Sequence, residues 1–168
     1  MLKDVAWRAM TGYDIAEVFA IANRVHPELF ESQAVLAEKQ ALYRNGCYVL
    51  EVSERPAGYV LSHPWRFGEV PALDGLIGAL TDDADTYYIH DLALLPLTRG
   101  IGAAGKIVEA LAKHARVLGL DSMTLVAVNS SRPFWERHGF ASETAPQLDA
   151  DLAGYGPDAR YMVRRLAD

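Results

Sequence analysis

Apolar residues recur every three or four positions in the first part of the chain, which is the spacing of one face of a helix. This pattern covers residues 15–25, and the pair His26-Pro27 ends it. It returns over residues 33–43 and stops at Asn45-Gly46. We therefore predict two successive helices, preceded by a short strand over residues 7–11.

The hydrophobic period then changes to that of strands. Residues 47–52 and 57–62 are rich in strand-forming residues and flank the turn Glu54-Arg55-Pro56, which predicts a hairpin. The later predictions, in chain order, are a loop over 63–85, a strand over 87–95, a long helix over 100–118, a strand over 123–128, a short helix over 132–138, a strand after Gly139-Phe140 and a strand over 161–166. This order predicts one α+β, or mixed α/β, domain over residues 1–168.

Composition narrows the class of protein. The 168 residues are 51% apolar and 23% charged, so the chain can bury a core without a disulfide or a metal. Sixteen Lys and Arg against 22 Asp and Glu give a net charge of −6, which argues against a nucleic-acid binder. Cys47 is the one cysteine, so an internal disulfide and a Cys-based zinc site are excluded. No apolar run approaches a membrane span, no secretory signal is expected at the start, and a reducing cytoplasm is the expected location.

Three glycines mark a candidate ligand loop. Gly100, Gly102 and Gly105 lie between the predicted strand 87–95 and the long helix. Unpaired amides and the helix dipole at such a helix start attract a phosphate or pyrophosphate. An alternative interpretation is that the glycines serve only close packing of strand and helix. The spacing also spells the dinucleotide fingerprint, but too little chain follows for the fold that fingerprint requires, and a P-loop is excluded because no Gly-Lys-Ser/Thr is present.

Three segments in this order resemble the GNAT superfamily of acyl-CoA N-acyltransferases. They are Asp91-Leu92-Ala93-Leu94-Leu95-Pro96, the loop Arg99-Gly100-Ile101-Gly102-Ala103 before a long helix, and Asn129 to Phe140 with its ending Phe134-Trp135-Glu136-Arg137-His138-Gly139-Phe140. The resemblance covers nearly the whole chain. It implies a twisted, mostly antiparallel sheet of six to seven strands flanked by about four helices, in which strand 87–95 splays from its parallel neighbour 123–128.

The resemblance also implies where acetyl-CoA binds. Its pantetheine arm would lie in the splayed gap along backbone groups of residues 92–94, and amides of residues 99–104 would hold the pyrophosphate. The expected CoA-binding residues are Leu92, Ala93, Leu94, Arg99, Gly100, Ile101, Gly102, Ala103, Ala104, Asn129, Ser131, Phe134 and Trp135. The sequence departs from the family in two places: Leu97 stands where the loop usually carries Gln or Arg, and Trp135 replaces the Tyr that commonly acts as general acid.

If Trp135 cannot act as the acid, the step that still needs a catalytic group is removal of a proton from the amine. A thiol with a pKa near ~8.5 can leave as thiolate, whereas an amine with a pKa of about 10.4 must first lose a proton. Barring a bulge, alternation along the strand places His90 and Tyr88 on the face of Leu94, so we expect His90 as base and Tyr88 as a proton donor or a water-holding group. Asp91 is the third candidate for the base or a water relay, although it would point to the other face unless a bulge re-aims it. The Leu94 amide is the expected oxyanion donor. A purely structural His90 is the alternative.

The acceptor site is expected between the loop that joins the first two helices and the loop after the hairpin. Glu28, Phe30, Glu31 and Trp65 are the candidate substrate-binding residues, and the alternative is that they form a solvated loop in which Phe30 and Trp65 cap the core. We therefore expect an acetyl-CoA-dependent N-acetyltransferase acting on a small amine, an amino acid or a peptide N-terminus, and a non-catalytic acyl-CoA-binding module is the second hypothesis. Acetyl-CoA and an amine are the expected partners and a homodimer the expected assembly, without metal, nucleic acid or membrane.

Overall fold

The computed structural model describes residues 4–144 and 146–166. Residues 1–3, part of the segment for which no secretory signal is expected, lie outside that range. Its strands and α-helices are β1 (Val5–Ala9), α1 (Ile15–Val25), α2 (Gln33–Leu42), β2 (Cys47–Val52), β3 (Arg55–Trp65), β4 (Thr86–Leu94), α3 (Ala103–Val117), β5 (Ser122–Ala127), α4 (Arg132–Arg137), β6 (Ala141–Ser142), α5 (Pro146–Leu152) and β7 (Arg160–Arg165). The predicted element order is confirmed, and α5 is the one α-helix of the described residues that the hydrophobic pattern did not indicate.

The strands of the described residues form one seven-stranded sheet in the order β1-β2-β3-β4-β5-β7-β6. Every neighbouring pair is antiparallel except β4 and β5, which run parallel. A parallel pair needs a crossover connection, and the long helix α3 supplies it. The mostly antiparallel sheet with one parallel pair is therefore confirmed.

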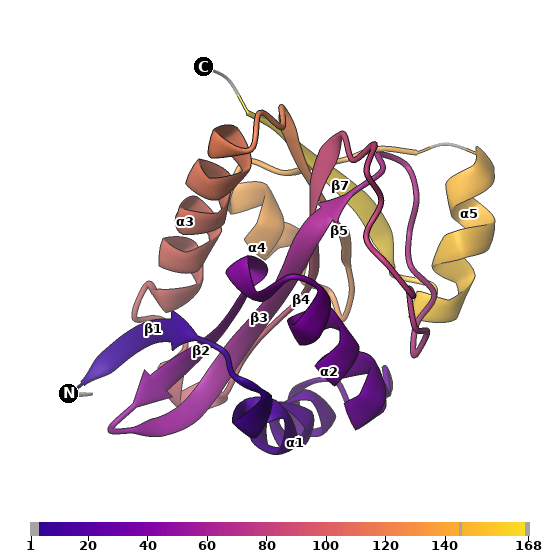
Figure 1. The fold of residues 1–168 in the computed structure, drawn as a ribbon. Helices are drawn as coiled ribbons and strands as arrows, with labels where there is room; N and C mark the ends of the chain where they lie inside the picture. Colours follow the sequence, from indigo (N-terminus) through magenta and orange to yellow (C-terminus); the bar gives the residue numbers. More distant parts are fainter. Residues whose placement is uncertain (1–3, 145, 167–168) are drawn as a thin grey trace.

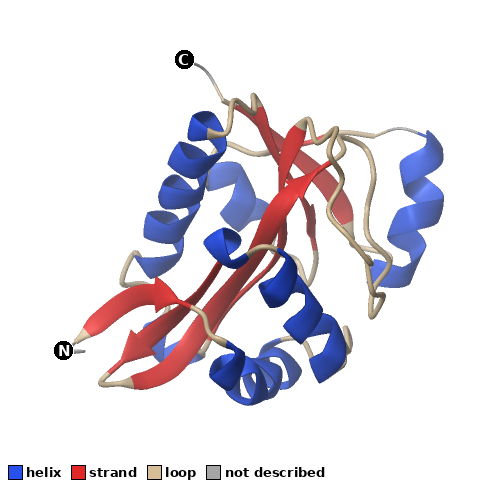
Figure 2. Cartoon of the chain, in the orientation of Figure 1, coloured by secondary structure: helices blue, strands red, loops and turns tan. Residues whose placement is uncertain are grey.

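Helices cover both faces of the twisted sheet (Figures 1 and 2). The apolar face of α3 packs with Trp135 of α4 against one face, in a core that includes Tyr87, Ile89 and Leu125. Helices α1 and α2 pack against the other face, in a core that includes Tyr59 and Leu61. Helix α5 lies further along this second face, where Leu148 contacts β7. Each strand of the middle of the sheet is thus buried on both sides, which explains its nearly continuous apolar sequence.

The start of α1 is fixed by polar contacts. Asp14 accepts a hydrogen bond from the Thr11 amide at 2.8 Å, and both of its carboxylate oxygens accept from the Arg8 guanidinium of β1. This arrangement joins the capping of α1 to the edge of the sheet. Among the described residues, no helix has the length and apolar character that crossing a membrane requires.

The long connection between β3 and β4 is held to α2 by carboxylates. Glu38 accepts hydrogen bonds from the amides of Ile77 and Gly78, and Glu31 accepts from the amide of Asp74. The buried Lys39 adds a bond from its Nζ to the Gly75 carbonyl. A loop without secondary structure is thereby fixed beside the loop that joins α1 and α2, where both border the site described next.

Candidate active site

Strands β4 and β5 separate part of the way along their length. Their parallel register covers Tyr87–Ile89 against Met123–Leu125, although β4 continues to Leu94 and β5 to Ala127. A cavity of about 470 Å³ opens where the pairing stops. The splayed parallel pair that the resemblance implied is therefore present, and the gap is lined by side chains of both strands.

Most of the expected CoA-binding residues line this cavity. They are Leu92, Ala93, Leu94, Arg99, Ala104, Asn129, Ser131, Phe134 and Trp135. Ile101, Gly102 and Ala103 instead line a second cavity of about 360 Å³ with residues of β1 and β2, and Gly100 lines neither cavity. The expected set is thus divided between the gap and this second cavity.

The backbone edge of β4 faces the gap at Leu94. The amide of the following residue, Leu95, donates to the Ala57 carbonyl of β3 at 2.9 Å. Successive residues of a strand direct their amides to opposite edges, so the Leu94 amide points away from β3, toward the side on which β5 has diverged. By the same alternation the Leu92 amide points there too. Both are placed to bond an extended ligand as a further strand would.

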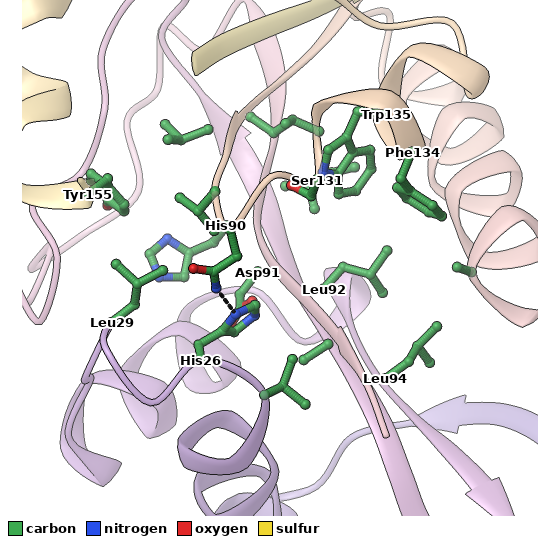
Figure 3. A pocket seen from close by; sticks show the side chains of 18 of the residues that line it. His26, Leu29, His90, Asp91, Leu92, Leu94, Ser131, Phe134, Trp135 and Tyr155 are labelled. Carbon is green, nitrogen blue, oxygen red and sulfur yellow. Dashed lines mark hydrogen bonds and ion pairs between the residues drawn. The ribbon is translucent and has the colours of Figure 1, made fainter. Parts of the chain in front are cut away.

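A bulge interrupts β4 at His90. Leu61 of β3 pairs with Asp91 and Ser62 pairs with Ile89, so His90 has no partner of its own. His90 and Asp91 consequently both face α1 and α2, while Leu92 and Leu94 face α3, as Figure 3 shows. The expectation that His90 and Tyr88 share the face of Leu94 is therefore wrong, because simple alternation fails at the bulge. Asp91 lies on the face opposite Leu94, as simple alternation predicted, and the bulge brings His90 onto that same face.

Asp91 forms a bonded pair with a histidine from α1. The Nε2 of His26, the residue after α1, lies 3.0 Å from Asp91 Oδ1, and the Tyr59 hydroxyl donates to Asp91 Oδ2. The other ring nitrogen, Nδ1, lies 3.0 Å from Nδ2 of Asn129, which follows β5 (Figure 3). Asn129 has a φ of 52°, so its backbone turns sharply at the end of the strand. Three elements thus meet around one imidazole.

His26 and Asp91 each stabilise the charged form of the other. Burial alone lowers the pKa of His26, but the hydrogen bond and charge of Asp91, with the charge of Glu31, outweigh it and raise the pKa. Burial likewise opposes ionisation of Asp91, yet the bonds from His26 and Tyr59 keep its pKa below the usual value. The side chains of His26 and Asp91 remain 15% and 16% exposed, so they can be reached from the cavity.

His90 makes a second pair on the same face. Its Nε2 lies 2.8 Å from Glu31 Oε1, and the other Glu31 oxygen accepts from the Asp74 amide at 3.1 Å. The His90 side chain is 1% exposed, and its Nδ1 is buried without a hydrogen-bond partner. Glu31 therefore joins the bulge of β4 to the loop between β3 and β4. Both Glu31 and His90 line the cavity.

The other expected catalytic and substrate residues lie elsewhere. Tyr88 is fully buried between the rings of His63 and His90, with centroid distances of 5.7 and 6.2 Å, and does not line the cavity. Glu28 and Phe30 are exposed on the loop after α1, where Phe30 packs edge-on against Phe19. Trp65 contacts the His63 ring at the end of β3. Of the four expected substrate-binding residues, Glu31 alone is in the cavity wall.

The glycine loop has a conformation that requires glycine at two positions. Gly100 and Gly102 have φ values of 82° and 81°, which L side chains rarely adopt. Gly105 serves packing instead, because a Cβ there would lie 2.9 Å from the His138 ring. Arg99 donates to the Leu94 carbonyl at 3.2 Å, which connects the loop to the end of β4.

The position of the missing tyrosine is part of the core. Trp135 is 7% exposed and packs edge-on against Phe134 and Phe140, at 4.9 and 5.3 Å between ring centroids. It lines the cavity with Phe134 and Ser131, so its ring forms one wall of the gap (Figure 3). Elsewhere in the fold, Cys47 is fully buried, and the half-buried His114 bonds the Tyr43 hydroxyl at 2.6 Å.

Three cavity residues had no signal in the sequence. His26 begins the loop expected to border the acceptor, but the sequence indicates no catalytic role for it. Leu73 and Tyr155 lie in segments without a motif. A catalytic role for His26 can be inferred only from its bond to Asp91, which is known once the register between β3 and β4 is known. Within residues 4–144 and 146–166, no group of three or more His, Cys, Asp or Glu is arranged to hold a metal ion.

The sequence matches a family model described as acetyltransferase (GNAT) family over residues 15–140. A comparison with curated proteins found no match. Three similar solved structures are Ard1 from Thermoplasma volcanium (TM-score 0.74, 17% identity, 98% of this chain and 99% of that chain), a GphF GNAT-like decarboxylase in complex with isobutyryl-CoA (0.76, 16%, 96% and 100%) and N-acetylglutamate synthase from Neisseria gonorrhoeae complexed with coenzyme A and N-acetyl-glutamate (0.71, 20%, 100% and 36%). At these identities the similarity shows a shared fold.

Proposed function

Because the chain belongs to the acetyltransferase (GNAT) family, we propose that it transfers an acetyl group directly from acetyl-CoA to a primary amine. The observation that carries the proposal is the position of the cavity. It opens where β4 and β5 separate, with free backbone edge on one side and the His26–Asp91 pair on the other. A thioester in the gap would therefore meet an amine held beside an imidazole.

Binding of the thioester would use mainly the backbone. The amides of Leu92 and Leu94 would bond the pantetheine arm, and the loop at Gly100 and Gly102 would present its amides to the pyrophosphate. Arg99 borders both the loop and the cavity and would add a positive charge. Two of the similar structures hold coenzyme A or an acyl-CoA, which supports CoA as the carrier.

The transfer itself needs one proton acceptor and one oxyanion donor. The amine nitrogen attacks the thioester carbon and loses a proton to Nδ1 of His26, which the Asp91 carboxylate orients through Nε2. The Leu94 amide stabilises the carbonyl oxygen while it carries negative charge. The C–S bond then breaks, and the thiol, with a pKa near ~8.5, leaves as thiolate without an acid at Trp135.

His26 is favoured over His90 by access. His26 is partly exposed and its Nδ1 is held by the exposed Asn129 amide, which an incoming amine can displace. Both nitrogens of His90 lie within the protein, one of them bonded to Glu31. His90 is therefore proposed as a positioning residue for Glu31, and its role as base stays the competing hypothesis. Within the described residues, the hydrogen bonds of Ser131 are to Val128 and Trp135 and to no histidine, so a covalent acyl-enzyme is not proposed.

Calorimetric titration with acetyl-CoA, with NAD as control, tests the first half of the proposal. Binding of acetyl-CoA in the micromolar range, followed by amine-dependent release of thiol, supports it. Binding without transfer to any amine would favour the non-catalytic acyl-CoA module, which the presence of Trp135 at the usual acid position allows. The absence of acetyl-CoA binding would overturn both. Cytoplasmic location and a homodimer stay predictions.

A further inference from the structure

The half of the cavity that faces the loop between α1 and α2 contains acidic and apolar groups. Asp91 and Glu31 lie on this side with the imidazoles of His26 and His90, and each imidazole is bonded to one of the two carboxylates. Leu29, Leu73 and Tyr155 form the surrounding walls, of which Leu29 and Tyr155 are labelled in Figure 3. This acceptor half, defined by these seven residues, has no cationic side chain apart from the two paired imidazoles.

Arg99 is the one Lys or Arg among the cavity-lining residues that the structure describes. Its guanidinium donates to the carbonyl of Leu94, near the end of β4 and next to the glycine loop. That position is next to the loop expected to hold the pyrophosphate, although the charge of Arg99 also reaches His26, whose pKa it lowers. The nearby buried Lys39 donates to the Gly75 carbonyl and does not line the cavity. Apart from Arg99, which is bonded to the Leu94 carbonyl, the described lining therefore offers no ammonium or guanidinium to an anion in the acceptor half.

The carboxylates impose a negative field on this space. The Glu31 side chain is 7% exposed and the Asp91 side chain 16% exposed, so solvent screens both charges only in part. Their influence reaches the opposite wall, because the pKa of the Tyr155 phenol is raised first by burial and then by the charges of Glu31 and Asp91. An ammonium group is attracted into such a space, whereas a carboxylate is repelled and would lose its hydration without a compensating partner.

We propose that the acceptor is a primary amine with no carboxylate on the carbon that bears the nitrogen. This inference rests on the proposed function and narrows it. A free α-amino acid would place its carboxylate two bonds from the attacking nitrogen, next to Asp91 and Glu31 and without a cation. A peptide N-terminus or a small alkyl- or arylalkylamine has no such charge, and its substituent meets the apolar walls of Leu29 and Leu73.

Matched acceptors test this directly. One series is L-leucine, L-leucinamide, 3-methylbutylamine and a tetrapeptide amide beginning with Leu, and the second series replaces leucine by phenylalanine. Binding is measured by calorimetry on protein saturated with CoA, and kcat/KM is measured by thiol release from acetyl-CoA. We expect each carboxylate-free member to exceed its amino acid by about tenfold or more in both quantities. The ratio between the tetrapeptide and the small amine then separates the two sources of such an amine.

A charge variant provides the converse test. Leu29→Arg places a guanidinium in the acceptor half, and Gln33→Arg places the same charge on the exposed first residue of α2. We expect Leu29→Arg to reduce the preference for leucinamide over leucine about tenfold, and Gln33→Arg to leave it unchanged. Glu31→Gln is the second variant, expected to reduce the preference in the same direction by removing a negative charge.

The outcomes separate this inference from the proposed function. Equal or better use of the free amino acids by the native protein would overturn the inference and leave N-acetyl transfer standing. Selective binding of the carboxylate-free amines without any transfer would support the inference and overturn the proposed function. The inference would also be overturned if Leu29→Arg and Glu31→Gln both keep the native preference for leucinamide over leucine while circular dichroism shows that both variants are folded.

Discussion

The imidazole Nε2 of His26 lies 3.0 Å from Asp91 Oδ1, although 65 positions separate the two residues in the chain. Helix α1 ends one residue before His26, and Asp91, which follows the bulge at His90, faces this end of the helix. Burial alone would lower the pKa of His26 and raise that of Asp91, and their mutual bond and charges reverse the direction of both shifts. The pair is thereby suited to accept a proton from an amine next to the gap.

Replacement of His26 tests the proposed base. His26→Ala and His26→Gln should lower kcat by about 10²–10⁴-fold, the usual contribution of a positioned base. The Kd for acetyl-CoA should remain within a few-fold, because the backbone edge of β4 and the glycine loop are untouched. Steady-state thiol release and calorimetry give the two quantities. A kcat within threefold of the native value would exclude His26 as base.

His90→Ala distinguishes the competing base. If His90 acts by positioning Glu31, this variant should raise KM for the amine more than it lowers kcat, since Glu31 fixes the loop at Asp74. If His90 is the base, kcat should fall steeply with CoA binding retained. A steep fall for His90→Ala beside a normal His26→Ala would restore the original hypothesis drawn from the sequence.

The pH dependence of His26 has a defined sign. Its pKa is raised above the ordinary value of about 6.5. The neutral, proton-accepting form of His26 therefore becomes the major one only when the pH exceeds this raised pKa, and the rate should increase over that range. Asp91→Asn removes the carboxylate charge and its charge-assisted hydrogen bond, which raise the pKa, and leaves the burial that lowers it, so the pKa of His26 should fall. Histidine-ring NMR titration measures this, with His26→Gln identifying the resonance. An unchanged or higher pKa in Asp91→Asn would contradict the pairing.

Trp135 should be dispensable as a proton donor. Its indole has no transferable proton at neutral pH, and it packs in the core with Phe134 and Phe140. Trp135→Phe should therefore reduce stability by roughly 1–3 kcal/mol while kcat stays within about threefold, measured well below the Tm. A hundredfold loss of kcat with CoA binding intact would show that the indole does more than pack.

The left-handed conformation of Gly102 predicts a cost for any side chain. Gly102→Ala should lower the free energy of unfolding by about 1–2 kcal/mol and weaken acetyl-CoA binding, because its φ is 81° although the space around it is open. Gly154→Ala is the control, since its surroundings are also open and its φ is not in that region. Equal Tm and Kd values for the two variants would refute the requirement for glycine at 102.

Cys47 should take no part in the reaction. It is fully buried, and burial raises the pKa of its thiol to about 12. We expect Cys47→Ala to keep kcat, and we expect a thiol reagent at pH 8 to label the native protein only after denaturant is added. Rapid labelling of the native protein together with loss of activity would reopen a covalent acyl-cysteine route.

The hydrophobic periods were sufficient for most of the fold because they report burial directly. The central strands are buried on both faces, and each covering helix is buried on one face, so their apolar patterns identify them clearly. Helix α5 was not predicted because only two of its seven side chains, Leu148 and Leu152, pack in the core, which is too few to establish a hydrophobic period. The glycines at 100 and 102 were informative because their backbone conformation is one that few other residues adopt.

The sequence by itself therefore determined the order of elements, the splayed parallel pair through its family resemblance, and the glycine loop. The tertiary structure alone decided which side chains meet. The bulge at His90 depends on the hydrogen-bond register between β3 and β4, which no local pattern specifies. His26 reaches Asp91, and Glu31 reaches His90, only because α1 and the loop after it pack over that bulge. Contacts between residues distant in sequence arise from packing, and packing is a property of the whole chain.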